Sequence, residues 1–215
     1  MEMPTDFMRL MRKGLREVAP FAFKRFTTSD RYWQTRYRYG GNSGKGSRGM
    51  AATEKAAFVN RLCRQHGITS IIDVGCGDGH VAQGYEVDRY LGLDISPAAI
   101  ELAAAANKSR PGRQFHPIDG MTPEAIAKLA DANSPRPRLA LSLDVMFHLV
   151  EDDTFRHYLA VLDSIPADWL LVQAPDVDGV AAGHVRDRAY SGRLAPHWSL
   201  MERLHAPDRC LFKRA

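Results

Sequence analysis

The feature that most constrains this chain is the stretch Ile71–His80, where an apolar run leads directly into alternating glycines. The run before Asp73 is β-branched and predicts a buried strand. Glycines at alternate positions let the backbone turn tightly and approach a ligand closely where a Cβ atom would collide. A helix is expected to follow, with free backbone N–H groups at its start. The stretch therefore predicts a strand, a ligand-facing loop and a helix.

The glycine spacing separates two kinds of nucleotide loop. A dinucleotide fingerprint, G-x-G-x-x-G, would need a third glycine where His80 stands. The sequence from Asp73 to Gly79 reads Asp-x-Gly-x-Gly-x-Gly instead. A second predicted strand, Tyr90–Asp94, ends in a carboxylate 21 residues after Asp73. That distance suits an acidic residue that accepts hydrogen bonds from ribose hydroxyls.

With these two motifs the chain resembles the class I S-adenosylmethionine (SAM) methyltransferases. The resemblance implies an α/β, Rossmann-like fold: a seven-stranded, mostly parallel sheet with helices on both faces and a reversed last strand. It also implies SAM as the cofactor, with Ile118 packed on the adenine ring and Asp119 accepting from its amino group. The cofactor-binding residues implied are Asp73, Gly75, Cys76, Gly77, Gly79, Asp94, Ile95, Ile118, Asp119, Gly120, Asp144 and Val145.

The rest of the chain alternates strand and helix patterns, as a parallel α/β sheet requires. The predicted helices are Thr53–His66, Ala98–Asn107, Thr122–Asp131 and Asp152–Leu162. The further predicted strands are Arg113–Pro117, Leu139–Leu143 and Trp169–Ala174, followed by a terminal hairpin of Trp198–Leu204 and Arg209–Lys213.

The N-terminal part differs in charge from the remainder. Residues 1–50 contain 11 Lys/Arg and 4 Asp/Glu, whereas the remaining residues contain 18 and 21. We therefore expect two parts, a basic N-terminal helix with a glycine-rich lid (1–52) and a methyltransferase domain (53–215). The apolar spacing within 1–26 predicts an amphipathic helix that packs on the domain or on a second subunit, as in a homodimer. A helix lying on a membrane surface is the alternative.

Aromatic residues and arginines lead into a glycine-rich loop. Residues 40–49 include five glycines, and Tyr32, Trp33 and Arg36 precede them. A mobile lid is expected, because such loops close over substrates; a disordered linker is the alternative. This arrangement also resembles one bacterial methyltransferase subgroup.

The fourth strand ends in Asp144–Val150, which resembles the Asp…His-Leu motif of small-molecule methyltransferases. It lacks the Asn/Asp-Pro-Pro-aromatic form used on amino groups of nucleic acids, so the motif does not favour a nucleic-acid acceptor. Transfer to an alcohol needs a base, and an unperturbed histidine titrates near neutrality. His148 is the first candidate, with Asp144 beside it, and His184 is the second. Alternatively, the following helix satisfies His148.

A metal offers another route. Some small-molecule O-methyltransferases bind Mg²⁺ to carboxylates beyond strands four and five, and Asp144 and Asp176 occupy comparable places. Oxygen ligands suit Mg²⁺. The alternative is that Asp144 caps local backbone and Asp176 is solvated.

The predicted acceptor is a small polar molecule, and we expect a sugar or oligosaccharide. Its predicted contacts are Tyr32, Trp33, Arg36, His184, Arg186 and Arg188. This assignment follows a resemblance to mycobacterial enzymes that build methylated mannose polysaccharides. The alternatives are a secondary-metabolite methyltransferase, an RNA or protein methyltransferase that uses the basic N-terminus, and a SAM-binding module without catalysis. No apolar run reaches the length of a membrane span, and three cysteines without metal-ligand spacing favour a cytoplasmic protein.

Overall fold

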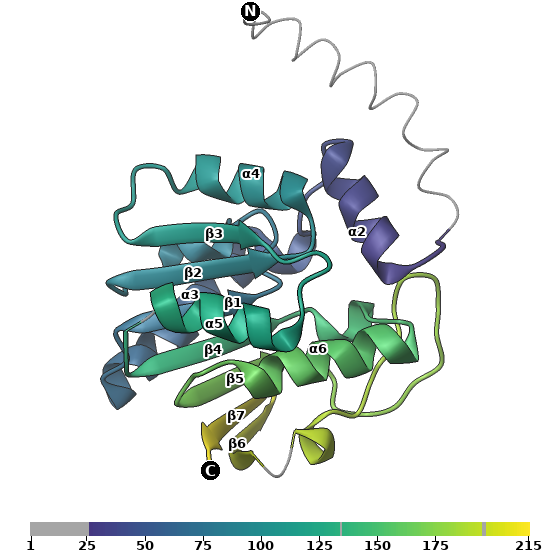
Figure 1. Ribbon diagram of the computed structural model, residues 1–215. Coiled ribbons are helices and arrows are strands. Elements are labelled where there is room, and N and C mark those ends of the chain that lie inside the picture. The colour runs from purple at the N-terminus through teal and green to yellow at the C-terminus, as the bar shows by residue number, and fades with distance from the viewer. Residues whose placement is uncertain (1–25, 134, 195–196) are drawn as a thin grey trace, which may run out of the picture.

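The computed structural model describes residues 26–133, 135–194 and 197–215. Its centre is a seven-stranded sheet in the order β3-β2-β1-β4-β5-β7-β6 (Figure 1). The strands are β1 Ser70–Val74, β2 Arg89–Asp94, β3 Arg113–Pro117, β4 Arg138–Leu143, β5 Trp169–Gln173, β6 Trp198–His205 and β7 Asp208–Arg214. The chain runs outward from β1 to β3 and then returns to β4 on the other side of β1. The strand order therefore reverses between β1 and β4.

The pairing within the sheet is mostly parallel. The five strands β1 to β5 form only parallel pairs with one another. Strand β7 is antiparallel both to β5 and to the edge strand β6. The predicted mostly parallel, seven-stranded sheet with a reversed last strand is confirmed.

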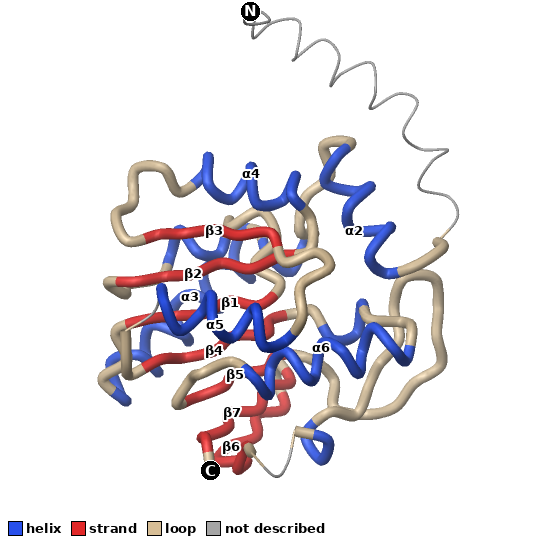
Figure 2. The backbone as a smooth tube through the Cα atoms, viewed as in Figure 1, coloured by secondary structure: helices blue, strands red, loops and turns tan. Residues whose placement is uncertain are grey.

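Helices cover both faces of this sheet (Figures 1 and 2). Their bounds are α2 Ser29–Arg38, α3 Gly49–His66, α4 Pro97–Ala106, α5 Pro123–Asn133 and α6 Asp152–Ser164. Helices α5 and α6 lie on the viewer's side in Figure 1, and α3 lies behind the sheet. None of the helices in the described ranges combines the length and apolarity needed to cross a membrane.

The core has two parts, one on each face of the sheet. Ile72 and Leu91 belong to the cluster that includes α5 and α6, whereas Ile71 and Leu139 belong to the cluster that includes α3. All four side chains are fully buried. Successive side chains in a strand point to opposite faces, and a parallel sheet is covered on both. This explains why the central strands β1, β2, β4 and β5 are buried and mostly apolar.

The segment after the glycine loop differs from the prediction. Only a short 3-10 turn, Val81–Gly84, stands where a helix was expected, so that prediction is wrong. Helix α3 packs on the turn, since a Cβ atom added at Gly84 would lie 2.6 Å from Ala56 Cβ. The Asn60 side chain also bonds the Gly84 carbonyl at 2.9 Å and the Glu86 amide at 3.0 Å. These contacts hold the turn where a longer helix would have continued.

The four helices predicted after residue 52 are present with similar boundaries, whereas α2 was not predicted. The Ser96 hydroxyl caps α4 by accepting from the Ala99 amide at 3.3 Å, and Gly67 ends α3 in the left-handed region (φ 62°). Helix α3 begins at Gly49, earlier than predicted, and so continues directly from the glycine-rich loop. Residues 1–25, which carry nearly all of the predicted amphipathic helix and its dimer contact, lie outside the described residues.

Candidate functional site

A cavity of about 710 Å³ lies where β1, β2 and β4 end. It sits at the point where the strand order reverses, the usual ligand position in open α/β sheets. Its volume falls within the range of roughly 300–1,000 Å³ that is common for small-molecule sites. The predicted cofactor residues that line it are Asp73, Gly75, Cys76, Gly77, Asp94, Ile95, Ile118, Asp119, Gly120, Asp144 and Val145. Of the predicted set, only Gly79 is not among the lining residues.

Glycine is required in the loop for two different reasons. Gly75 has φ 87°, and a Cβ atom there would lie 2.5 Å from Val145 Cγ2, at the cavity wall. Gly79 has φ 67°, but its Cβ atom would lie 2.8 Å from Ala103 Cβ in α4. The first glycine thus shapes the cavity, and the last allows α4 to pack against the loop.

The Asp94 carboxylate is fixed at the end of β2 and is almost fully buried. One of its oxygens accepts from the Gly77 amide and the other from the Ser96 amide, both at 2.9 Å. Burial raises the pKa of Asp94 to about 6, although the two backbone hydrogen bonds oppose this shift. Each carboxylate oxygen has a second lone pair, so this side chain can still accept from a ligand in the cavity.

A second buried carboxyl, that of Asp73, lies at the end of β1. It accepts a hydrogen bond from the Tyr90 hydroxyl at 2.8 Å. Burial raises the pKa of Asp73 to about 7, and the Tyr90 hydrogen bond opposes that rise. The cavity therefore contains a carboxyl that keeps its proton to a higher pH than an exposed aspartate does.

The glycine-rich residues 40–49, which we call the strap, lie directly against the glycine loop. The Ser43 amide donates to Asp78 Oδ2 at 3.2 Å, and the Asp78 amide donates to Ser43 Oγ at 3.1 Å. The Arg48 guanidinium also pairs with the Asp78 carboxylate. Burial raises the pKa of Asp78, but its bonds to Arg48 and Ser43 outweigh this and hold the pKa below its ordinary value. The strap is thus tied to the loop that shapes the cavity.

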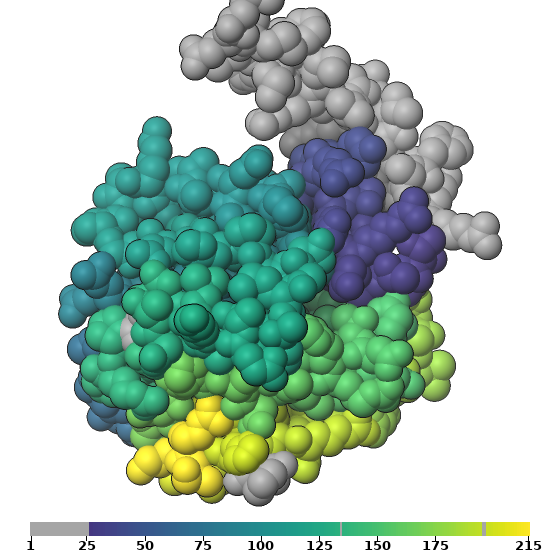
Figure 3. All heavy atoms as spheres, in the orientation of Figure 1, coloured from purple at the N-terminus to yellow at the C-terminus, as the bar shows by residue number. Residues whose placement is uncertain are grey.

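Helix α2 brings predicted acceptor residues to one end of the cavity. Its atoms pack against the body of the molecule in Figure 3. The Trp33 ring lies 4.8 Å from the His148 ring, and the Tyr32 ring stacks on the His184 ring at 4.3 Å. The two histidine rings are 5.2 Å apart, and the Arg36 guanidinium lies over Trp33. The structure therefore gathers these five residues, although only Trp33 and His148 line the cavity.

His148 is held in one tautomer. Its Nδ1 atom lies 3.1 Å from the His184 carbonyl oxygen. A carbonyl only accepts, so Nδ1 carries the proton and Nε2 is the acceptor. Burial lowers the pKa of His148 to about 4, against the effect of this hydrogen bond. The expected titration near neutrality is wrong, because burial penalises the charged imidazolium.

The Asp144 carboxylate, which follows β4 and lines the same cavity as His148, is paired with a lysine that the sequence motifs did not indicate. The Lys55 ammonium forms an ion pair with Asp144 and donates to the Gly46 carbonyl at 2.7 Å. The Gln173 amide donates to the other Asp144 oxygen at 2.8 Å. The sequence offered one signal for this lysine, its position in α3. Lys55 has the helical spacing of the buried residues Ala52 and Val59, so it could have been predicted to face the interior.

The predicted Mg²⁺ ligands do not fit that role. The Lys55 ammonium already supplies a positive charge to Asp144, and Asp176 bonds the Tyr190 amide at 2.7 Å, Ser191 and Arg203. Asp176 does not line the cavity, and its low exposure also overturns the alternative of a solvated side chain. Within residues 26–133, 135–194 and 197–215, no group of three or more His, Cys, Asp or Glu residues could hold a metal ion.

Two predicted acceptor residues, Arg186 and Arg188, point elsewhere. Both donate to the Val150 carbonyl and pair with Asp152 at the start of α6. Arg188 is buried over the Phe155 ring, and neither arginine lines the cavity. The structure therefore does not bring either arginine to the cavity as predicted, because Asp152 at the start of α6 and the Val150 carbonyl before it already bind them.

The sequence matches no protein-family model and no curated protein. Solved structures give clear matches of fold. One is the N-methyltransferase NodS from Bradyrhizobium japonicum, in complex with S-adenosyl-L-homocysteine (TM-score 0.62, 16% identity, covering 87% of this chain and 99% of NodS). Another is the methyltransferase domain of the bacterial protein CtHen1 (TM-score 0.57, 15% identity, 76% of this chain and 98% of that domain).

A third match is a SAM-dependent methyltransferase from Anabaena variabilis, with a TM-score of 0.53 and 16% identity. It covers 76% of this chain and 86% of that protein. At these identities the likeness concerns the fold. The chain has the fold of the SAM-dependent methyltransferases.

Proposed function

We propose that this protein is a SAM-dependent methyltransferase that methylates a hydroxyl group of a small polar acceptor, a sugar or oligosaccharide. One observation carries the proposal: the glycine loop and Asp94, which we call the cofactor end, line the same cavity as Trp33, His148 and Asp144, which we call the reactive end. The fold supports the reaction class, and the aromatic wall supports the acceptor class.

The residues at the strand ends fit the cofactor. In this proposal Asp94 accepts from the ribose hydroxyls, Ile118 and Asp119 border the adenine, and the backbone at Gly75 and Gly77 borders the methionine part. The bound cofactor supplies a methyl group already activated on a sulfonium. The chain's own task is then to align the acceptor and exclude water, and alignment of this kind contributes on the order of 7–11 kcal/mol to lowering a barrier.

His148 would orient the acceptor hydroxyl and take its proton. Its Nε2 atom is the unprotonated nitrogen, because Nδ1 donates to the His184 carbonyl. With a pKa of about 4, the imidazole is neutral at physiological pH and is a weak base. We therefore infer that the hydroxyl proton moves to Nε2 as the new C–O bond forms, rather than before it.

The reactive end of the cavity is lined by groups that suit a sugar. Trp33 offers an aromatic ring, and each Asp144 oxygen keeps a lone pair beyond its bond to Lys55 or Gln173. We further propose that residues 1–52 act as a cover, with the strap as its lid over the methionine end of the cavity. The remaining residues, 53–215, would form the catalytic domain.

Release of S-adenosylhomocysteine across a panel of mono- and oligosaccharides, with and without EDTA, tests the proposal. Turnover on a saccharide that persists in EDTA is the expected result. Loss of turnover in EDTA would reinstate a metal. No turnover on any saccharide, with S-adenosylhomocysteine still bound, would refute the sugar acceptor while leaving a methyltransferase.

An RNA acceptor is a second candidate, favoured by likeness to two RNA-related structures. The small RNA methyltransferase HEN1 and an Escherichia coli rRNA methylase match with TM-scores of 0.56 and 0.51 at 16% and 15% identity. The basic residues within 1–50 would supply phosphate contacts. RNA binding that weakens steeply between low and moderate salt would support this candidate. No binding at low salt would remove it.

A further inference from the structure

A buried lysine stands at the reactive end of the cavity. Lys55 is only 4% exposed, and it is the one lysine or arginine among the described residues that line the cavity. Taking an ammonium and a carboxylate out of water is costly, so buried ion pairs are often no better for stability than an apolar pair of the same size. Stability alone therefore does not explain the pair that Lys55 forms with Asp144.

The partner carboxylate is held from several sides. Asp144 follows β4 with φ 61°, a conformation that side-chain-bearing residues rarely adopt. Its second oxygen accepts from Gln173, and the Gln173 oxygen in turn accepts from the buried Arg209 at 2.7 Å. The carboxylate is thus fixed at the cavity wall by groups from α3, β5 and β7.

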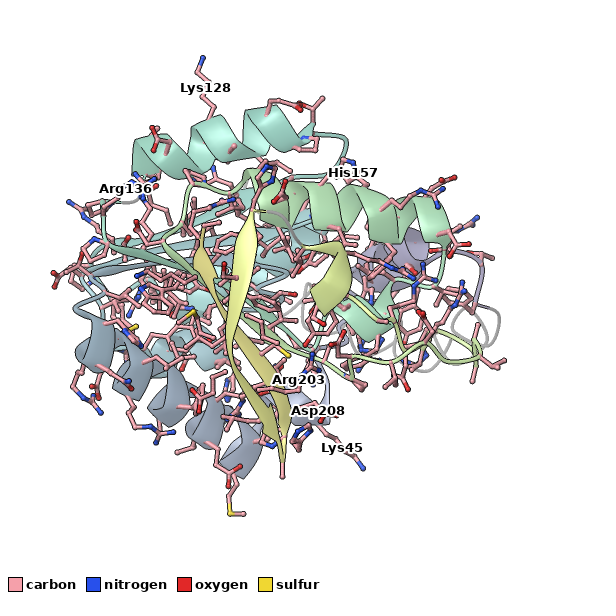
Figure 4. The ribbon with its side chains drawn as sticks, turned by 90° about the horizontal axis from the view of Figure 1, so that it is seen from below. Lys45, Lys128, Arg136, His157, Arg203 and Asp208 are labelled. Atoms are coloured by element: carbon pink, nitrogen blue, oxygen red, sulfur yellow. The ribbon has the colours of Figure 1, made fainter. Side chains whose placement is uncertain are left out.

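The strap meets the same pair. Lys55 donates to the Gly46 carbonyl, and a Cβ atom added at Gly46 would lie 2.6 Å from Asp144 Oδ2 and 3.6 Å from Lys55 Nζ. Only a residue without a side chain fits against the carboxylate in this way. Lys45, beside it, extends outward from the molecule (Figure 4). The strap therefore presents its backbone, not a side chain, to the ion pair.

We propose that Lys55 is a positioning residue that holds the strap closed on the Asp144 carboxylate and so joins the strap to the reactive end. The strap then has two attachments. Ser43 and Arg48 bind Asp78 in the glycine loop, and Gly46 binds Lys55 beside Asp144. Closing the strap brings the cofactor loop and the end of β4 under one cover. Opening it requires both attachments to break.

Amide hydrogen exchange tests the proposal on the protein alone. The Ser43 amide bonds Asp78 and the Arg48 amide bonds the Lys45 carbonyl, so both are protected while the strap is closed. In Lys55→Met these two amides should exchange at least about tenfold faster, since a lost hydrogen bond to a charged group is worth that much. The amides of β1 should keep their wild-type rates. The matched control is Arg64→Met, which removes an exposed ion pair from the same helix.

A second variant approaches the attachment from the strap. Gly46→Ala leaves the core unchanged and places a methyl group against Asp144, and Gly192→Ala is its control because a Cβ atom there meets nothing within 4 Å. Gly46→Ala should also speed exchange at Ser43 and Arg48, and it decides the matter if Lys55→Met does not fold. Wild-type exchange in the strap of either folded variant, with only a lower melting temperature, would overturn the proposal and leave Lys55 a structural residue.

The consequence for ligand exchange rests on the proposed function. S-adenosylhomocysteine should leave Lys55→Met and Gly46→Ala at least about tenfold faster than the wild type, with arrival rates changed less. Faster hydrogen exchange at the strap amides with an unchanged rate of ligand release would confine the role of Lys55 to the strap. It would refute the link between Lys55 and the reactive end. If the wild type binds no S-adenosylhomocysteine, the proposed function fails, and the exchange result still tests the attachment.

Discussion

The two ends of the cavity are built in different ways. The cofactor end comes from short motifs at the ends of neighbouring strands, with Gly75, Asp94 and Asp119 each following or closing its own strand. The reactive end comes from residues far apart in the chain, where Trp33 from α2 meets His148 after β4 and Lys55 from α3 meets Asp144. Motifs therefore specify the first end, whereas only the folded chain assembles the second.

The largest expected effect lies at the reactive end. His148→Ala should lower turnover at least about 10²-fold, because a positioned base contributes roughly 10²–10⁴-fold. Affinity for S-adenosylhomocysteine should stay at the wild-type value, since His148 belongs to the other end. Parallel measurement of kcat and of the dissociation constant checks both statements. Near-normal turnover would show that His148 is not the base, and a large loss of affinity would show that His148 also serves cofactor binding.

The glycine loop should respond in the opposite way. Gly77→Ala places a methyl group 2.7 Å from the Tyr37 hydroxyl, against Ser43, and at φ 57°. The strained backbone alone should cost about 1–3 kcal/mol of stability or binding. Calorimetry should therefore show weaker S-adenosylhomocysteine binding, and Ser43→Gly in the same chain should restore part of it. Full affinity in Gly77→Ala would mean that neither the strap nor the loop approaches the ligand.

The buried carboxyls give the cofactor end a pH signature. The pKa of Asp73 is about 7 in the folded protein and near 3.8 when it is exposed, so the folded state binds the extra proton between these values. Stability that is fully present below about pH 4 is thus lost as pH rises through 7, with a slope of at most about 1.4 kcal/mol per pH unit. Asp94, with a pKa of about 6, acts in the same direction over a narrower range.

Melting curves between pH 5 and 8, compared with Asp73→Asn, check this sign. As pH rises, the wild type should lose stability relative to Asp73→Asn, because the variant has no carboxyl at this position to release a proton. A difference that is constant over this range would show that Asp73 does not titrate there.

The smallest effect is expected at Arg186. Its ion pair with Asp152 is partly exposed, and pairs of this kind contribute about 0–1 kcal/mol. Arg186→Ala should change KM for the acceptor less than about twofold, a limit well under 1 kcal/mol. A tenfold rise in KM would return this arginine to the acceptor site.

The success of the sequence analysis followed the same division. The motif around Gly75 and the carboxylate of Asp94 predicted the fold, and both residues line the cavity, because strand ends and glycine turns depend on local sequence. The pairing of Arg188 with Asp152 and of Lys55 with Asp144 depends on long-range packing, and no motif encodes it. The low pKa of His148 likewise follows from burial that only the folded chain reveals.

Titration of S-adenosylhomocysteine into the wild type and Asp94→Ala tests the central claim most directly. One ligand should bind each chain, and Asp94→Ala should weaken binding by about 1.5–3 kcal/mol, the worth of hydrogen bonds to a charged group. Binding that is absent in the wild type, or equally tight in Asp94→Ala, would contradict the assignment of this cavity to the cofactor.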